Sequence, residues 1–363
     1  MTDFTKRIAL DNGQAEWLLQ GLQEVTLCPV CASGQRRMEL SNVRDTTYGA
    51  APGAWCVYRC SGCGCVYLNP QPTSETLPLA YRNYYTHVAE LAPSLARPGA
   101  LFRRMIGNSI RNREFRGKFK PAMPFGWVMA ALLKSQARSV CMEGRGLGKC
   151  REAGTLLDVG CGNGKFLEFA RALGWRGYGI ELDAEAREVV KKKGFDLIGK
   201  QVEDVTGRYD GFFDVITLSH VIEHVYDPVG LLRTCRELLK PDGFIWLETP
   251  NIDSEGYRRF GQFWRGLEIP RHLVVFGARS LRLAMSRAGL KRIEFLTPRD
   301  VTSTMFSLSM GMREGRIVEV QSEPLSGHGK SEVRTEAKAA RSIVRREPHK
   351  SEFLTVTAYR DEV

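Results

Sequence analysis

A strand that ends in a glycine-rich turn constrains this chain more than any other stretch of its 363 residues. The apolar run from Leu156 to Val159 leads into three glycines at alternate positions, Gly160, Gly162 and Gly164. Apolar residues then recur at helical spacing, so the stretch predicts a strand, a sharp turn and a helix. Glycine lets the backbone bend there and lets a ligand approach the amides closely. The start of the helix adds a partial positive charge, which favours an electron-rich ligand.

A second predicted strand, from Tyr178 to Asp183, carries an acid near its end. Glu181 lies about 20 residues past the glycine turn, the spacing at which a βαβ unit brings a carboxylate to the ribose of a nucleotide. A carboxylate can accept hydrogen bonds from two neighbouring hydroxyls at once. The turn and the acid together therefore predict a site for a nucleotide-like cofactor. An ordinary βαβ pair with a surface glutamate is the alternative.

The pattern Asp158-x-Gly160-Cys161-Gly162-x-Gly164, followed by Glu181, resembles the first two motifs of class I S-adenosylmethionine-dependent methyltransferases. The resemblance covers roughly residues 153–300 and includes the runs FDVITLSHVIEH and LLKPDGFIWLETPN. It implies an α/β fold with a Rossmann-like seven-stranded sheet, in the order 3-2-1-4-5-7-6, and helices on both faces. It also implies an enzyme that uses S-adenosyl-L-methionine. The cofactor-binding residues that it suggests are Asp158, Gly160, Cys161, Gly162, Gly164, Glu181, Leu182, Val202, Glu203 and Ser219.

Two C-x-x-C pairs, Cys28/Cys31 and Cys60/Cys63, stand about 30 residues apart. This spacing is typical of a zinc ribbon, in which four thiolates close a tetrahedron around a structural Zn²⁺. Cys56 and Cys65 lie nearby, and the sequence leaves open whether one of them replaces a ligand. The chain begins without an apolar signal-peptide core, so its ten cysteines do not indicate a disulfide framework.

Composition and motifs divide the chain into three predicted parts. Residues 1–90 form the zinc-ribbon module, 91–152 a basic helical cap and linker, and 153–363 the methyltransferase domain. Within the last part, residues 311–350 are rich in charged and small residues and predict a mobile insertion, and the sequence leaves open whether it is ordered. No stretch reaches the length of about 20 apolar residues that a transmembrane helix needs, and we expect a cytoplasmic protein.

Histidine is the natural proton acceptor near neutral pH if the methyl acceptor is a hydroxyl. His272 and His220 fall in segments expected at the cleft and are the candidate catalytic bases. Glu223 and His224 follow His220 at helical spacing, which resembles a metal-holding run of some family members. Because His220 replaces the first glutamate of that run, we do not favour a catalytic divalent metal.

The favoured function is methyl transfer to a hydroxyl, or to carbon, of a sugar, a polysaccharide precursor or another small or lipid-linked metabolite. The net charge of +11 indicates an anionic partner without identifying it. One alternative is an RNA methyltransferase that binds phosphates with its ribbon and basic helices. Another is a non-catalytic scaffold that retains a cofactor pocket. The basic residues around the apolar stripe from Leu101 to Ile110 also leave peripheral membrane contact open.

Overall fold

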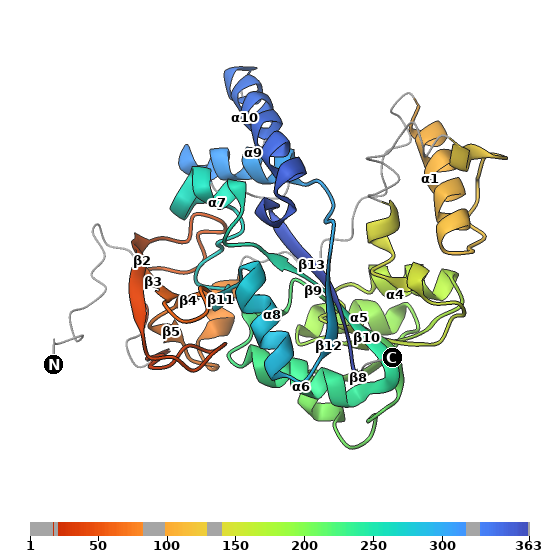
Figure 1. The fold of residues 1–363 in the computed structure, drawn as a ribbon, viewed down its shortest axis with the longest axis horizontal. Coiled ribbons are helices and arrows are strands. Elements are labelled where there is room, and N and C mark those ends of the chain that lie inside the picture. Colours follow the sequence, from red (N-terminus) through yellow and green to blue (C-terminus); the bar gives the residue numbers. More distant parts are fainter. Residues whose placement is uncertain (1–16, 18–20, 83–98, 129–139, 317–326, 362–363) are drawn as a thin grey trace.

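The computed structural model describes residues 17, 21–82, 99–128, 140–316 and 327–361. Its largest element is a seven-stranded sheet in the order β12-β13-β10-β9-β6-β7-β8. This order confirms the predicted 3-2-1-4-5-7-6 arrangement, and the chain has the Rossmann-like fold expected from its sequence (Figure 1). The strands are β6 Thr155–Val159, β7 Arg176–Ile180, β8 Asp196–Gly199, β9 Phe213–Ser219, β10 Leu239–Pro250, β12 Lys291–Leu296 and β13 Phe353–Tyr359.

Helices pack on both faces of this sheet because successive residues of each strand point to opposite sides. Leu156 of β6 faces a core built with α4 and α5, and the next residue, Leu157, faces a core built with α6 and α8. The strands from β6 to β10 run parallel, and β13 is antiparallel to both of its neighbours. The helices are α4 Lys165–Ala172, α5 Ala184–Lys192, α6 Pro228–Leu238, α7 Glu255–Phe260, α8 Ala278–Arg287, α9 Thr302–Arg313 and α10 Gly327–Arg346.

A second sheet holds three strands of the N-terminal part and one strand from later in the chain. It has the order β11-β4-β3-β2, with β2 Arg36–Val43, β3 Trp55–Cys60, β4 Val66–Leu68 and β11 Val274–Val275. The strand β11 follows β10 by more than 20 residues yet pairs antiparallel with β4. The segment after the fifth strand of the large sheet therefore completes the N-terminal sheet. The short strands β1 Leu22–Gln23 and β5 Gln71–Pro72 pair separately.

The segment 311–350, predicted as a mobile insertion, is largely helical where it is described. The helix α9 ends at Arg313. The helix α10 spans Gly327–Arg346 and packs against α9 and α7. Val333, Ala337 and Ala340 of α10 are buried. The sequence left open whether this segment is ordered. The helix is ordered because its few apolar residues share one helical face and cover α9.

The described residues between 100 and 150, which are 100–128 and 140–150, pack beside α4 rather than on the N-terminal sheet. The helix α1, Ala100–Glu114, is followed by the 3₁₀ turns η3 Gly126–Val128 and η4 Leu147–Lys149. Phe115 and Phe119 contact Phe169 of α4, with ring centroids 5.5 Å and 5.6 Å apart. Figure 1 places α1 and the N-terminal sheet at opposite ends of the long axis. Among the described helices, none is both long and apolar enough to cross a membrane.

Candidate active site and cysteine cluster

The glycine turn has the backbone that its sequence requires. Gly160, Gly162 and Gly164 have φ values of 68°, 54° and 78°, a region that side chains with a Cβ rarely adopt. A Cβ on Gly160 would come 2.7 Å from a methyl carbon of Val221, whereas one on Gly162 would meet no atom within 4 Å. The turn is therefore tightly packed at its base and open at Gly162, where a ligand has room.

Glu181 turns its carboxylate toward this opening. The Gly162 amide donates to Glu181 Oε2 at 2.8 Å, and the Asp183 amide donates to Oε1 at 2.9 Å. The parallel pairing of β6 with β7 brings the end of each strand to the same edge of the sheet. Leu182, beside Glu181, is 69% exposed. The edge thus presents an anchored carboxylate next to an open apolar side chain, which suits the diol and the base of a nucleoside.

The other predicted cofactor residues divide into surface and core positions. Cys161 is buried, and its sulfur would lie 2.8 Å from a Cβ placed on Gly179, so only its backbone can face a ligand. Val202 is also buried, whereas Glu203 is exposed on the 3₁₀ turn η5 Val202–Val205. Ser219 is partly exposed at the end of β9.

Asp158 is buried and bound to a residue that the sequence did not single out. Its Oδ1 accepts hydrogen bonds from Arg145 at 2.6 Å and from Thr217 at 2.7 Å. Burial raises the pKa of Asp158, although Arg145 and Thr217 favour the charged form. Arg145 also lies over the Phe166 ring, 4.2 Å from its centroid. No spacing in the sequence relates Arg145 to β6, so only the folded chain reveals this pair.

His220 lies directly after β9, beside the glycine turn, and is held between two buried carboxylates. Its Nδ1 is 3.2 Å from Glu223 Oε1, and its Nε2 is 3.6 Å from Glu248 Oε1. Burial alone would lower the pKa of His220, but the hydrogen bonds of Glu223 and Glu248 raise it to about 9. The side chain remains 32% exposed and packs edge-on against Phe353, with ring centroids 4.7 Å apart.

His272, the other predicted base, is 4% exposed. Its Nδ1 lies 2.9 Å from the Gly266 carbonyl oxygen, and its ring packs edge-on against His224. Burial, and then the neighbouring His224, lower the pKa of His272 to about 4, so the ring is neutral at pH 7. The structure therefore places His272 in the interior and His220 at the open edge.

Glu223, His224 and His272 have donor atoms within 4.8 Å of one another, a grouping that could hold a metal ion. The Glu223 carboxylate already accepts from Thr249 Oγ1 at 3.0 Å and pairs with His220. His224 Nδ1 lies 2.9 Å from the Tyr81 hydroxyl. These partners already occupy the Glu223 carboxylate and His224 Nδ1.

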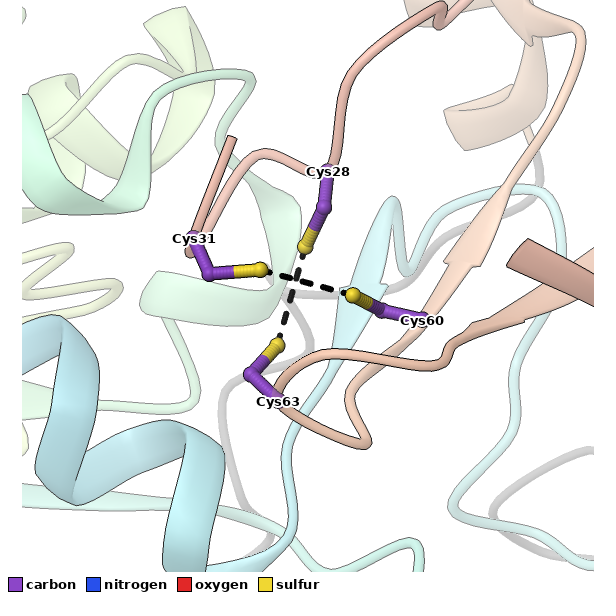
Figure 2. Close-up of side chains that lie close together, drawn as sticks. All are labelled: Cys28, Cys31, Cys60 and Cys63. Carbon is purple, nitrogen blue, oxygen red and sulfur yellow. Dashed lines mark hydrogen bonds between the residues drawn. The ribbon is translucent and has the colours of Figure 1, made fainter. Parts of the chain in front are cut away.

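Figure 2 shows the sulfurs of Cys28, Cys31, Cys60 and Cys63 pointing toward a common centre. The Sγ atoms are 3.7 Å apart between Cys28 and Cys63, and 3.4 Å apart between Cys31 and Cys60. Four thiolates at about 2.3 Å from a tetrahedral zinc ion would be about 3.8 Å apart, so the cluster fits Zn²⁺. A Cβ on Gly62 would lie 3.3 Å from the Cys31 sulfur, so a larger residue in this turn would crowd the cluster.

Cys65 brings a fifth sulfur to the cluster. Its Sγ is 3.4 Å from that of Cys28 and 3.5 Å from that of Cys63. The four sulfurs of the predicted set all lie within 4.8 Å of one another, and Cys65 is not part of that mutual group. The geometry therefore favours the predicted four ligands, with the Cys65 sulfur in contact with two of them.

Comparison with known proteins agrees with this architecture. Residues 134–294 match the family model of a methyltransferase domain. Ubiquinone biosynthesis O-methyltransferase of Paraburkholderia xenovorans is 27% identical over 180 residues, which are 48% of this chain and 71% of the relative. The protein of the same name from Xanthomonas oryzae is 29% identical over 178 residues, 47% of this chain and 64% of the relative. The chain thus spans about two thirds of the length of these relatives.

A solved S-adenosylmethionine-dependent methyltransferase from Archaeoglobus fulgidus aligns with a TM-score of 0.41 and 18% identity, over 68% of this chain and 97% of its own. The strand order and the family match define a Rossmann-like methyltransferase domain. The protein is an S-adenosylmethionine-dependent methyltransferase, and S-adenosylmethionine is the cofactor of its domain.

Proposed function

We propose that this methyltransferase modifies a hydroxyl oxygen of a small molecule, and that His220 receives the hydroxyl proton. The observation that carries the proposal is the position of His220: it lies partly exposed at the carboxyl edge of β9, next to the glycine turn. In its neutral form the ring can accept a proton, and Glu223 and Glu248 stabilise the imidazolium that results. The names of the relatives support oxygen as the acceptor atom.

The bound cofactor would supply an electrophilic methyl group on a sulfonium. The residues proposed to hold it are Glu181 and the amides of the glycine turn, with Leu182 covering the base. Asp158 lies in β6 just before the turn and is held by hydrogen bonds from Arg145 and Thr217, so it would stabilise the turn. Holding donor and acceptor in line contributes much of the rate in such a transfer, so these residues act by positioning.

The proposal is tested by measuring S-adenosylhomocysteine release from purified protein with a panel of acceptors. The panel contains hydroxylated aromatic compounds, nucleotide sugars and a structured RNA. Turnover with a small hydroxylated compound, lost in His220→Gln, is the expected result. A chain that methylates the RNA and none of the small molecules would contradict it. Turnover with the nucleotide sugars in particular would establish the sugar acceptor that the sequence favours.

A further inference from the structure

Large apolar side chains are exposed around α1 and η3. Among the described residues, seven large hydrophobic side chains are exposed, and four of them fall between residues 100 and 128. These are Leu101, Phe102, Phe125 and Val128, which are 55%, 51%, 77% and 52% exposed. Scattered exposed apolar residues are ordinary, but a concentration in one short region indicates a contact surface.

Three of the four side chains belong to α1 and η3, which pack together, and Phe125 directly precedes η3. Ser109 Oγ of α1 donates to the Met123 carbonyl and accepts from the Met123 amide, at 2.9 Å and 3.0 Å. A Cβ on Gly126 of η3 would lie 2.6 Å from this same oxygen. Phe102 precedes Ser109 by seven residues, about two helical turns, and so lies on the same side of α1. The exposed residues of α1 and η3 therefore border one surface, which we call the α1 surface.

The α1 surface is strongly basic. Seven basic residues and one acid, Glu114, lie between residues 100 and 128, and one of the seven, Arg111, forms an ion pair with Glu143. The basic residues are Arg103, Arg104, Arg111, Arg113, Arg116, Lys118 and Lys120. The first turn of α1 is exposed throughout, from Leu101 to Arg104, while Phe115 fixes the other end of the helix against α4. A rigid support thus presents apolar side chains next to positive charge.

We propose that the α1 surface docks onto a membrane that contains anionic phospholipids. Leu101, Phe102, Phe125 and Val128 would enter the boundary between head groups and acyl chains, and the arginines and lysines would contact lipid phosphates. Aliphatic side chains such as Leu101 and Val128 gain from burial in lipid but would not stack on nucleic-acid bases, so the surface fits a bilayer better than RNA. Docking there would bring the methyltransferase site near acceptors that reside in the membrane.

The experiment is sedimentation of the full chain with vesicles of phosphatidylcholine alone or mixed with phosphatidylglycerol. Binding to the anionic vesicles is expected, with little binding to the neutral ones. Leu101→Ser/Phe102→Ser should reduce the affinity by about tenfold or more, because two apolar side chains no longer enter the lipid. Arg104→Glu/Lys118→Glu should also weaken binding and reduce its dependence on salt.

Met38→Ser is the matched control, because Met38 is 48% exposed on β2, at the other end of the molecule. It should bind vesicles as the unchanged chain does, and circular dichroism verifies that all variants are folded. Failure of the unchanged chain to bind anionic vesicles would overturn the proposal. Equal binding by Leu101→Ser/Phe102→Ser, or binding to a single-stranded RNA without binding to vesicles, would do the same. Vesicle binding requires no turnover, so it is independent of the proposed acceptor.

Discussion

Arg271 and Asp45 are 226 positions apart and form a doubly hydrogen-bonded ion pair closed to solvent. The two guanidinium nitrogens donate to the Asp45 oxygens at 2.9 Å and 2.6 Å, and Arg271 also donates to the Ala80 carbonyl. Asp45 accepts further hydrogen bonds from backbone amides, those of Thr47, Tyr48, Ala50 and Ala51. The pair joins the N-terminal sheet to the segment that follows β10.

Replacing Arg271 should therefore destabilise the whole chain. Arg271→Ala leaves the Asp45 carboxylate buried without its counter-charge, a change that typically costs about 3–5 kcal/mol. Denaturant unfolding followed by circular dichroism measures this loss. Lys191→Ala is the matched control, because Lys191 pairs with Glu188 in an exposed position, where ion pairs contribute little. Equal midpoints for the two variants would show that the buried pair does not stabilise the connection.

The pKa of His220 gives a prediction for the dependence of turnover on pH. Since the neighbouring carboxylates raise this pKa to about 9, the neutral fraction of His220 is small at pH 7, reaches one half near pH 9 and approaches completion above it. If His220 is the base, kcat should rise through pH 7 and 8 and level off above about 9. The stabilisation that the His220 imidazolium gives the fold has the opposite trend: it is complete below pH 6.5 and is lost as the pH passes about 9.

His220→Gln should lower kcat by about a hundredfold or more and remove this pH dependence. His349→Gln serves as the control, because the side chain of His349 is 56% exposed on the turn after α10. A rate that falls between pH 7 and 9 would instead indicate that the charged ring is the active form.

The cysteine cluster predicts one zinc ion per chain by elemental analysis. Cys28→Ser/Cys60→Ser should lose the metal, because it removes one ligand from each pair. Cys65→Ser should retain it, since Cys65 approaches Cys28 and Cys63 but lies outside the mutual group of four sulfurs. Loss of zinc from Cys65→Ser, with zinc retained by Cys63→Ser, would show that Cys65 is the fourth ligand.

A substitution at Gly162 can test cofactor binding apart from folding, because the space around this residue is open. Gly162→Ala introduces a Cβ where φ is 54° and no atom lies within 4 Å, so it should cost about 1–2 kcal/mol of stability from backbone strain alone. Because the new methyl group would occupy the proposed ligand space, affinity for S-adenosylmethionine should fall by about tenfold or more.

Gly207→Ala is an equivalent control, with φ of 77° and open surroundings, and lies away from the glycine turn. It should lose a similar amount of stability to backbone strain, while its affinity for S-adenosylmethionine stays unchanged. A similar loss of affinity in both variants would mean that strain, not occupied space, weakens binding.

Local sequence patterns predicted the large sheet because each strand, turn and helix of a βαβ unit leaves its own signal within a few residues. The turn at Gly160 and the acid at Glu181 could be related because the length of one such unit fixes their spacing. The pairing of β11 with β4, the contact of Arg145 with Asp158 and the burial of His272 depend on segments far apart in the sequence. Glu248 is visible in the sequence as a carboxylate inside an apolar strand. Its contact with His220 explains why a charged residue stands there.

Titration calorimetry with S-adenosylmethionine tests most directly whether the glycine turn and Glu181 form the cofactor site. The unchanged chain should bind one equivalent, and Glu181→Ala should bind at least about tenfold more weakly, because hydrogen bonds to a charged group contribute about 1.5–3 kcal/mol each. Glu188→Ala, on the exposed side of α5, should bind normally. Undiminished binding by Glu181→Ala, or no binding by the unchanged chain, would contradict the site.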